Sequence, residues 1–138
     1  MPIERPYHHI RMNVRTIDDM LAEARSRLTR LDPVEANAAV REGALLIDIR
    51  AESQRAADGV VPGAIFVARN VLEWRCDPSS EHRDPRIDGR EHQLIIMCNE
   101  GYQSSLAAAT LHELGLTRTT DLDGGFQAWR AAGLPVER

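Results

Sequence analysis

The stretch LIIMCNEGYQSS, residues 94–105, decides the fold of this chain. It begins with four apolar residues, continues through a cysteine and a turn containing Gly101, and leads into an alanine-rich segment. An uninterrupted apolar run is typical of a strand covered on both faces, as in a parallel sheet. The order strand, turn, helix therefore predicts an α/β fold with Cys98 at the carboxyl end of a buried strand.

The same order of elements recurs on both sides of this stretch. Strands are predicted at 44–49, 65–67, 94–97 and 119–122, and helices at about 16–31, from Pro33 to Gly43, at 70–74, at 104–114 and across Phe126 and Trp129. Successive βα units with right-handed crossovers bring the strand ends, and with them Cys98, to one edge of the sheet. The polar segment 75–92 shows little periodicity, and long loops of this kind tend to be functional or mobile.

The composition is that of one soluble domain, with 138 residues, 43% hydrophobic and 28% charged. We expect an N-terminal extension at 1–31, irregular before its helix, and a domain at 32–138. The net charge of −4 argues against nucleic acid as a partner, and the lack of a long apolar run argues against a membrane span. All seventeen basic residues are arginines, which excludes lysine-based Schiff-base and phosphate-loop mechanisms.

Cys98 is the candidate nucleophile of the chain. The N–H groups at the start of the following helix, together with the helix dipole, favour a thiolate over a thiol at this position. The alternative is an inert buried cysteine, since unpaired cysteines are often buried. The chain has only one other cysteine, Cys76, and the start MPIERP lacks the apolar core of a secretory signal, so we expect reduced thiols and a cytoplasmic location.

Four motifs in order carry a resemblance to a known family. They are ALLIDIR at 44–50, VPGA at 61–64, CNEGYQS at 98–104 and DGGFQAWRAAGLP at 123–135. Over roughly 32–136 the chain resembles a single-domain rhodanese, which is a sulfurtransferase. The resemblance implies a three-layer α/β/α fold with a central parallel sheet of about five strands.

The resemblance also implies a mechanism. Cys98 would accept a sulfane sulfur from a donor such as thiosulfate or a persulfide, and pass it from the resulting persulfide to cyanide, a small thiol or a protein thiol. The substrate-binding loop would be formed, mainly through backbone amides, by Asn99, Glu100, Gly101, Tyr102, Gln103 and Ser104. No cofactor and no metal are expected, and the five histidines lack the close spacing of zinc ligands.

The loop departs from the commoner family pattern in its charge. Many members carry arginine at the positions of Asn99 or Gln103, whereas here the loop has no cation and Glu100 adds a negative charge. We therefore expect weak binding of the thiosulfate dianion and favour a persulfide or an uncharged thiol donor. The alternative functions are a non-catalytic binding or redox-sensing module and a phosphatase. The phosphatase is disfavoured because the sixth residue after Cys98 is Ser104 and not the arginine that clamps a phosphoryl group.

Several neighbouring residues have a structural and a functional interpretation. Cys76 is either a resolving thiol or an incidental exposed loop cysteine. The hydroxyls of Ser104 and Ser105 either cap the helix or donate to the sulfur. Asp48 and Arg50 either contact the substrate or, as we expect, take part in an ion pair that braces the loop, with Glu52 as the natural partner of Arg50.

Overall fold

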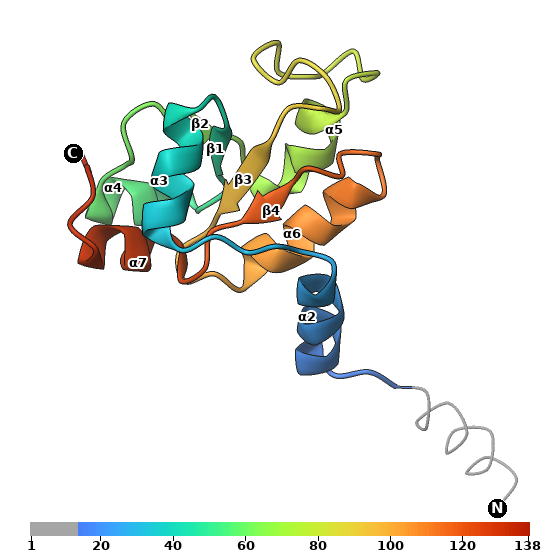
Figure 1. Ribbon diagram of the computed structural model, residues 1–138, viewed down its shortest axis with the longest axis horizontal. Helices are drawn as coiled ribbons and strands as arrows, with labels where there is room; N and C mark the ends of the chain where they lie inside the picture. The colour runs from blue at the N-terminus through green and yellow to red at the C-terminus, as the bar shows by residue number, and fades with distance from the viewer. Residues whose placement is uncertain (1–13) are drawn as a thin grey trace, which may run out of the picture.

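In the computed structural model, which describes residues 14–138, a parallel sheet lies between two layers of helices (Figure 1). The strands are β1 (Leu45–Asp48), β2 (Ile65–Phe66), β3 (Leu94–Met97) and β4 (Thr120–Asp121), in the spatial order β2-β1-β3-β4. Every pairing is parallel. The predicted α/β fold is confirmed, with four strands against the expected five or so.

The apolar run of β3 forms the centre of the molecule. Leu94 and Ile96 face one hydrophobic cluster, Ile95 and Met97 face the other, and all four are fully buried. Complete burial of each such side chain stabilises the fold by roughly 1.5–3 kcal/mol. This burial explains why an unbroken apolar run, without polar alternation, forms a strand here.

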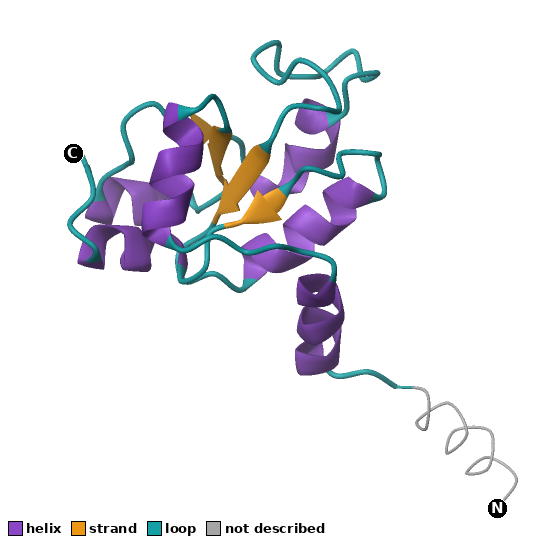
Figure 2. Cartoon of the chain, in the orientation of Figure 1, coloured by secondary structure: helices purple, strands orange, loops and turns teal. Residues whose placement is uncertain are grey.

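The helices divide between the two faces of the sheet (Figure 2). They are α2 (Ile17–Ser26), α3 (Pro33–Arg41), α4 (Glu52–Asp58), the 3₁₀ turn η1 (Arg69–Val71), α5 (Leu72–Cys76), α6 (Gln103–His112) and α7 (Gly125–Ala131). Helices α5 and α6 contribute to the cluster that contains Leu94 and Ile96, and α3 and α7 to the other. Helix α2 packs on α6. Within residues 14–138, no helix combines the length and the apolar character needed to cross a membrane.

Helix α2 is shorter than predicted. It begins close to the predicted start, where Thr16 and Asp19 form a capping box, but it ends at Ser26 and does not continue to residue 31. Leu31 instead forms a parallel bridge to Leu122, with its N–H donating to the Asp121 carbonyl at 3.1 Å. The prediction for 27–31 was wrong because a non-local backbone pairing overrides helical periodicity there. Residues 1–13, predicted to be an irregular lead-in, lie outside the described part of the chain.

The polar segment 77–93 connects α5 to the amino end of β3, at the edge of the sheet opposite Cys98 (Figure 1). The fully buried side chain of Ile87 fixes it to the core. The Asp84 N–H donates to the Arg75 carbonyl at 2.8 Å, which holds the segment to the end of α5. This loop therefore does not contribute to the site around Cys98.

Candidate functional site

Cys98 lies where β1 and β3 end side by side. The register pairs Asp48 with Met97, and the Ile49 N–H donates to the Met97 carbonyl at 2.9 Å. The residues that follow each strand, Ile49 and Cys98, therefore meet at the carboxyl edge of the sheet, where ligands bind in open α/β folds. Cys98 is 7% exposed.

Two backbone amides point at the sulfur. The Gly101 N–H donates to Cys98 Sγ at 3.1 Å, and the Ser104 N–H donates to the same atom at 3.3 Å. Ser104 lies in the first turn of α6, whose N–H groups have no partner within the helix. A negatively charged sulfur gains from both donors and from the positive end of the helix dipole. The arrangement suits a thiolate or a persulfide anion.

The side chains of the predicted loop residues point elsewhere. The Asn99 Oδ1 accepts a hydrogen bond from Gln127 Nε2 at 3.0 Å, while Glu100, Tyr102 and Gln103 are exposed. The Ser104 hydroxyl donates to Asp121 Oδ2 at 2.8 Å and so does not donate to the sulfur. Two of the six predicted loop residues, Gly101 and Ser104, thus direct their amides at the Cys98 sulfur, and substrate binding by the loop stays a prediction.

Helix α7 holds the other side of the loop through backbone groups. The Phe126 N–H donates to the Cys98 carbonyl at 2.9 Å, and the Gln127 N–H donates to the Asn99 carbonyl at 3.1 Å. Gly125 allows this approach, because a Cβ there would lie 2.5 Å from the Cys98 carbonyl oxygen. The motif at 123–135 therefore shapes the loop without contributing a side chain to the sulfur.

A cleft of about 230 Å³ opens over Cys98. Its lining comes from the ends of β1 and β3 and from α4 and the loop: Ile49, Arg50, Ala51, Gln54, Cys98, Asn99, Glu100, Tyr102 and Gln103. Apart from Arg50, whose side chain is fully buried, no lining residue is a cation, and Glu100 is an acid. A cleft of this size can hold a small sulfur compound. None of its lining residues presents an exposed positive side chain that could bind a dianion.

Arg50 braces the edge of the sheet beside this cleft. Its guanidinium donates twice to Asp48, at 3.1 and 2.9 Å, and once to the Gly59 carbonyl at 2.9 Å, and it lies 3.8 Å from the centre of the Phe126 ring. The expectation of a bracing ion pair was correct, but the expected partner, Glu52, was wrong. Asp48 is already buried beside Arg50, whereas Glu52 is exposed at the start of α4.

Cys76 differs from an exposed loop thiol. It is fully buried at the end of α5. Burial, followed by the charges of Asp84 and Glu73, raises its pKa to about 12. The thiol therefore stays protonated near neutral pH, and its burial gives no support to a role as a resolving thiol.

Three charged residues contact the loop on the side away from the cleft. They were not predicted from the sequence to belong to the site. Arg25 and Arg30 each donate to the Gly101 carbonyl at 2.8 Å. Asp121 accepts the hydroxyls of Ser104 and Ser105, at 2.8 and 2.7 Å. No local motif marks the two arginines, because Arg25 and Arg30 precede Gly101 by more than seventy positions.

Comparison with known proteins gives consistent similarities. The family model described as Rhodanese-like domain matches residues 32–132. A sulfurtransferase of Allochromatium vinosum is 32% identical over 95 residues, which cover 69% of this chain and 79% of the relative. The thiosulfate sulfurtransferase GlpE of Stutzerimonas stutzeri is 31% identical over 101 residues, which cover 73% of this chain and 84% of the relative.

Solved structures share the fold. A Rhodopseudomonas palustris protein of unknown function, described as a "possible tyrosine phosphatase", superimposes with a TM-score of 0.81 at 35% identity, over 90% of this chain and 96% of its own. A thiosulfate sulfurtransferase from Pseudomonas aeruginosa gives a TM-score of 0.63 at 28% identity, over 78% of this chain and 19% of its own.

Proposed function

This chain belongs to the rhodanese-like domain family, and from that premise we propose that it is a sulfurtransferase that carries a sulfane sulfur on Cys98. One observation above all supports the proposal: the N–H groups of Gly101 and Ser104 converge on Cys98 Sγ at 3.1 and 3.3 Å. Such donors stabilise negative charge on sulfur before and after it accepts a second sulfur atom.

The reaction has two displacement steps. In the first, the Cys98 thiolate attacks the outer sulfur of the donor, a new S–S bond forms, and the donor's S–S bond breaks. The departing group takes the bonding electron pair, leaving as sulfite from thiosulfate or as a thiolate from a persulfide. In the second, an acceptor thiolate or cyanide attacks the outer sulfur of the Cys98 persulfide, and the Cys98 thiolate returns.

The charge around the cleft favours a persulfide donor over thiosulfate. Thiosulfate is a dianion, and among the exposed loop side chains the only charged one is Glu100, which repels it. A persulfide brings a single negative charge, which the two amides and the helix dipole are suited to accept. We therefore propose a thiol-bound persulfide as the donor and a small or protein thiol as the acceptor.

Phosphoryl transfer fits the site poorly. A phosphoryl group has three charged oxygens and is bound best by a bidentate guanidinium. No residue from Asn99 to Ser104 is an arginine, and the Ser104 hydroxyl is committed to Asp121. Activity on an aryl phosphate is expected to be at background.

Intact-mass analysis tests the proposal. The wild type and Cys98→Ser are treated in parallel with thiosulfate and with a low-molecular-weight persulfide, and free donor is then removed. The wild type is expected to gain the mass of one sulfur atom, more completely from the persulfide, and to lose it when cyanide or a thiol is added. Cys98→Ser should gain nothing.

Cys76→Ser is the matched control, because it removes the other thiol and leaves the loop intact. It is expected to gain and lose sulfur as the wild type does. A wild type that gains no sulfur from either donor contradicts the proposal. Oxidation of Cys98 in the same samples without sulfur transfer would favour the sensing module instead.

A further inference from the structure

One residue of the loop links the sulfur to two arginines. The N–H of Gly101 donates to Cys98 Sγ, and its carbonyl, on the outer side of the loop, accepts from Arg25 Nη2 and Arg30 Nη2 at 2.8 Å each. Hydrogen bonds from a charged donor are roughly twice as strong as neutral ones. The orientation of Gly101 is therefore fixed from outside the loop.

Each arginine is held in place by further contacts. Arg30 is 17% exposed, forks onto both oxygens of Asp121 at 3.0 and 3.2 Å, and pairs with Asp123 at 3.1 Å. Arg25 donates to the Ser105 hydroxyl at 3.1 Å and lies 5.6 Å from the centre of the Tyr102 ring. No carboxylate in residues 14–138 pairs with Arg25, so its positive charge is not neutralised by an ion pair.

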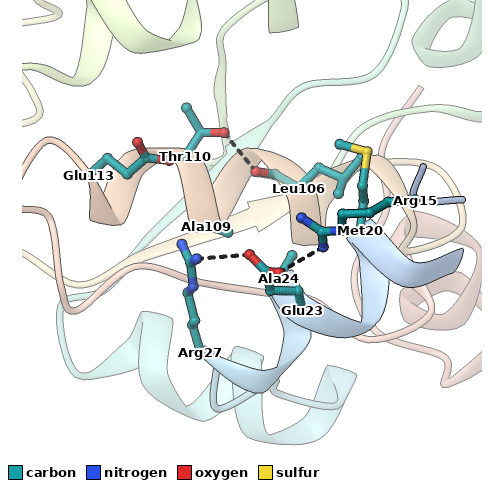
Figure 3. Close-up of a pocket in the computed structure, with 9 residues that line it drawn as sticks. All are labelled: Arg15, Met20, Glu23, Ala24, Arg27, Leu106, Ala109, Thr110 and Glu113. Carbon is teal, nitrogen blue, oxygen red and sulfur yellow. Dashed lines mark hydrogen bonds and ion pairs between the residues drawn. The ribbon is translucent and has the colours of Figure 1, made fainter. Parts of the chain in front are cut away.

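The packing of α2 on α6 aims Arg25 at the loop. Figure 3 shows the groove between the two helices, where the small side chains of Ala24 and Ala109 lie among the lining residues. Ala24 is the buried residue of α2. Arg27, in the turn after α2, lines the same groove and pairs with Glu23 at 3.1 Å. Arg25 and Arg27 thus extend from one end of the same helix to different surroundings.

We propose that Arg25 and Arg30 are positioning residues for the Cys98 loop, which makes the segment before the rhodanese-like domain a functional part of the site. They keep the Gly101 N–H directed at the sulfur and place positive charge behind a loop whose own residues, Asn99 to Gln103, carry none. The proposal rests on the sulfur chemistry proposed for Cys98. It concerns how readily that thiol ionises and reacts.

Other charged and titratable groups also surround Cys98. They are the Asp48–Arg50 pair at the end of β1, Glu100 and Tyr102 in the loop, the Arg69–Glu73 pair beside Gln103, and Asp121 in β4. Arg69 is paired with Glu73, and Arg50 shares the Asp48 carboxylate with Arg55 of α4, so each of these arginines has an ion-pair partner. Arg25 therefore stands out as the unpaired cation that reaches the loop backbone within the described chain.

The experiment measures alkylation of Cys98 by iodoacetamide across a pH series in the full chain. Arg25→Gln is expected to lower the second-order rate near neutral pH by about tenfold, the effect of losing one charged hydrogen bond. The midpoint of its pH–rate profile should move to higher pH. Arg25→Lys, which keeps the charge, should recover most of the loss. Arg27→Gln, the matched control, should react as the wild type does.

Two outcomes overturn the proposal. In the first, Arg25→Gln has the same rate and pH profile as Arg27→Gln. In the second, Arg25→Gln reacts slowly, but its pH profile does not move and Arg25→Lys is equally slow. Arg30→Lys serves as a second variant, because removal of the charge at Arg30 would leave Asp121 buried without its partner. A lysine keeps the charge but has no guanidinium fork to bind Asp121 and the Gly101 carbonyl together, so Arg30→Lys should slow alkylation while the protein stays folded. Alkylation at the wild-type rate would overturn the role of Arg30. Alkylation needs no sulfur donor, so these results stand apart from the sulfur-transfer assay.

Discussion

Substitution of Gly101 by alanine tests the geometry of the sulfur site directly. Gly101 has a φ of +88°, a conformation that side chains disfavour, and a Cβ there would lie 2.7 Å from the Gly124 nitrogen and 3.2 Å from Arg30 Nη2. The first of these is a backbone atom that cannot move aside cheaply. The loop must shift, and the Gly101 N–H moves with it.

Two separate costs follow from this substitution. The left-handed backbone alone costs about 1–2 kcal/mol of folding stability. Loss of the hydrogen bond from Gly101 N–H to a charged sulfur costs about 1.5–3 kcal/mol, which corresponds to roughly a tenfold to a hundredfold slower formation of the persulfide. The second cost appears only in the chemistry at Cys98.

Gly63→Ala is the matched control, because Gly63 has a φ of +82° and its Cβ would meet nothing within 4 Å. Urea unfolding of both variants gives the loss of stability, and rapid quenching followed by intact-mass analysis gives the rate of persulfide formation. We expect both variants to lose stability and only Gly101→Ala to form the persulfide slowly. If Gly101→Ala forms it at the wild-type rate, the Gly101 amide does not stabilise the sulfur and the reasoning is wrong.

Three further predictions concern the rest of the molecule. Asp48→Asn leaves a buried guanidinium without its counter-charge and should lower the free energy of unfolding by about 3–5 kcal/mol in urea titrations. Because burial raises the pKa of Cys76 to about 12, iodoacetamide should label Cys98 alone in the native protein near neutral pH and reach Cys76 only after denaturation, as peptide mapping will show. Hydrogen bonds from the Arg86 side chain hold the pKa of Asp84 below its usual range. This pair therefore stabilises the fold fully at pH values above the unfolded-state pKa of Asp84. The stabilisation is lost as the pH falls through the lower folded-state pKa. Urea titrations at falling pH should therefore show the stability difference between the wild type and Asp84→Asn shrinking below about pH 4; a constant difference would contradict this assignment.

Local patterns predicted those elements whose structure depends on neighbouring residues. The run Leu94–Met97 forms β3 as expected, and the turn after it places Cys98 at the sheet edge. Predictions from local sequence patterns were wrong where contacts with a distant segment determine the backbone conformation. Helix α2 ends early because Leu31 pairs with Leu122, a partner ninety-one residues later in the sequence. The contacts of Arg25 with the loop could not be inferred, since no spacing rule relates residues so far apart.

The way in which the loop is held bears on how this family member could evolve. Its shape is set through main-chain atoms, with the Cys98 and Asn99 carbonyls bound by α7 and the Gly101 carbonyl bound by two arginines. The side chains of Glu100 and Gln103 are exposed and do not hold these carbonyls, whereas the Tyr102 ring lies beside Arg25. Mutations at Glu100 and Gln103 can therefore change which donor or acceptor is recognised while the nucleophile keeps its environment. The same property makes them the positions of choice for redesigning substrate preference.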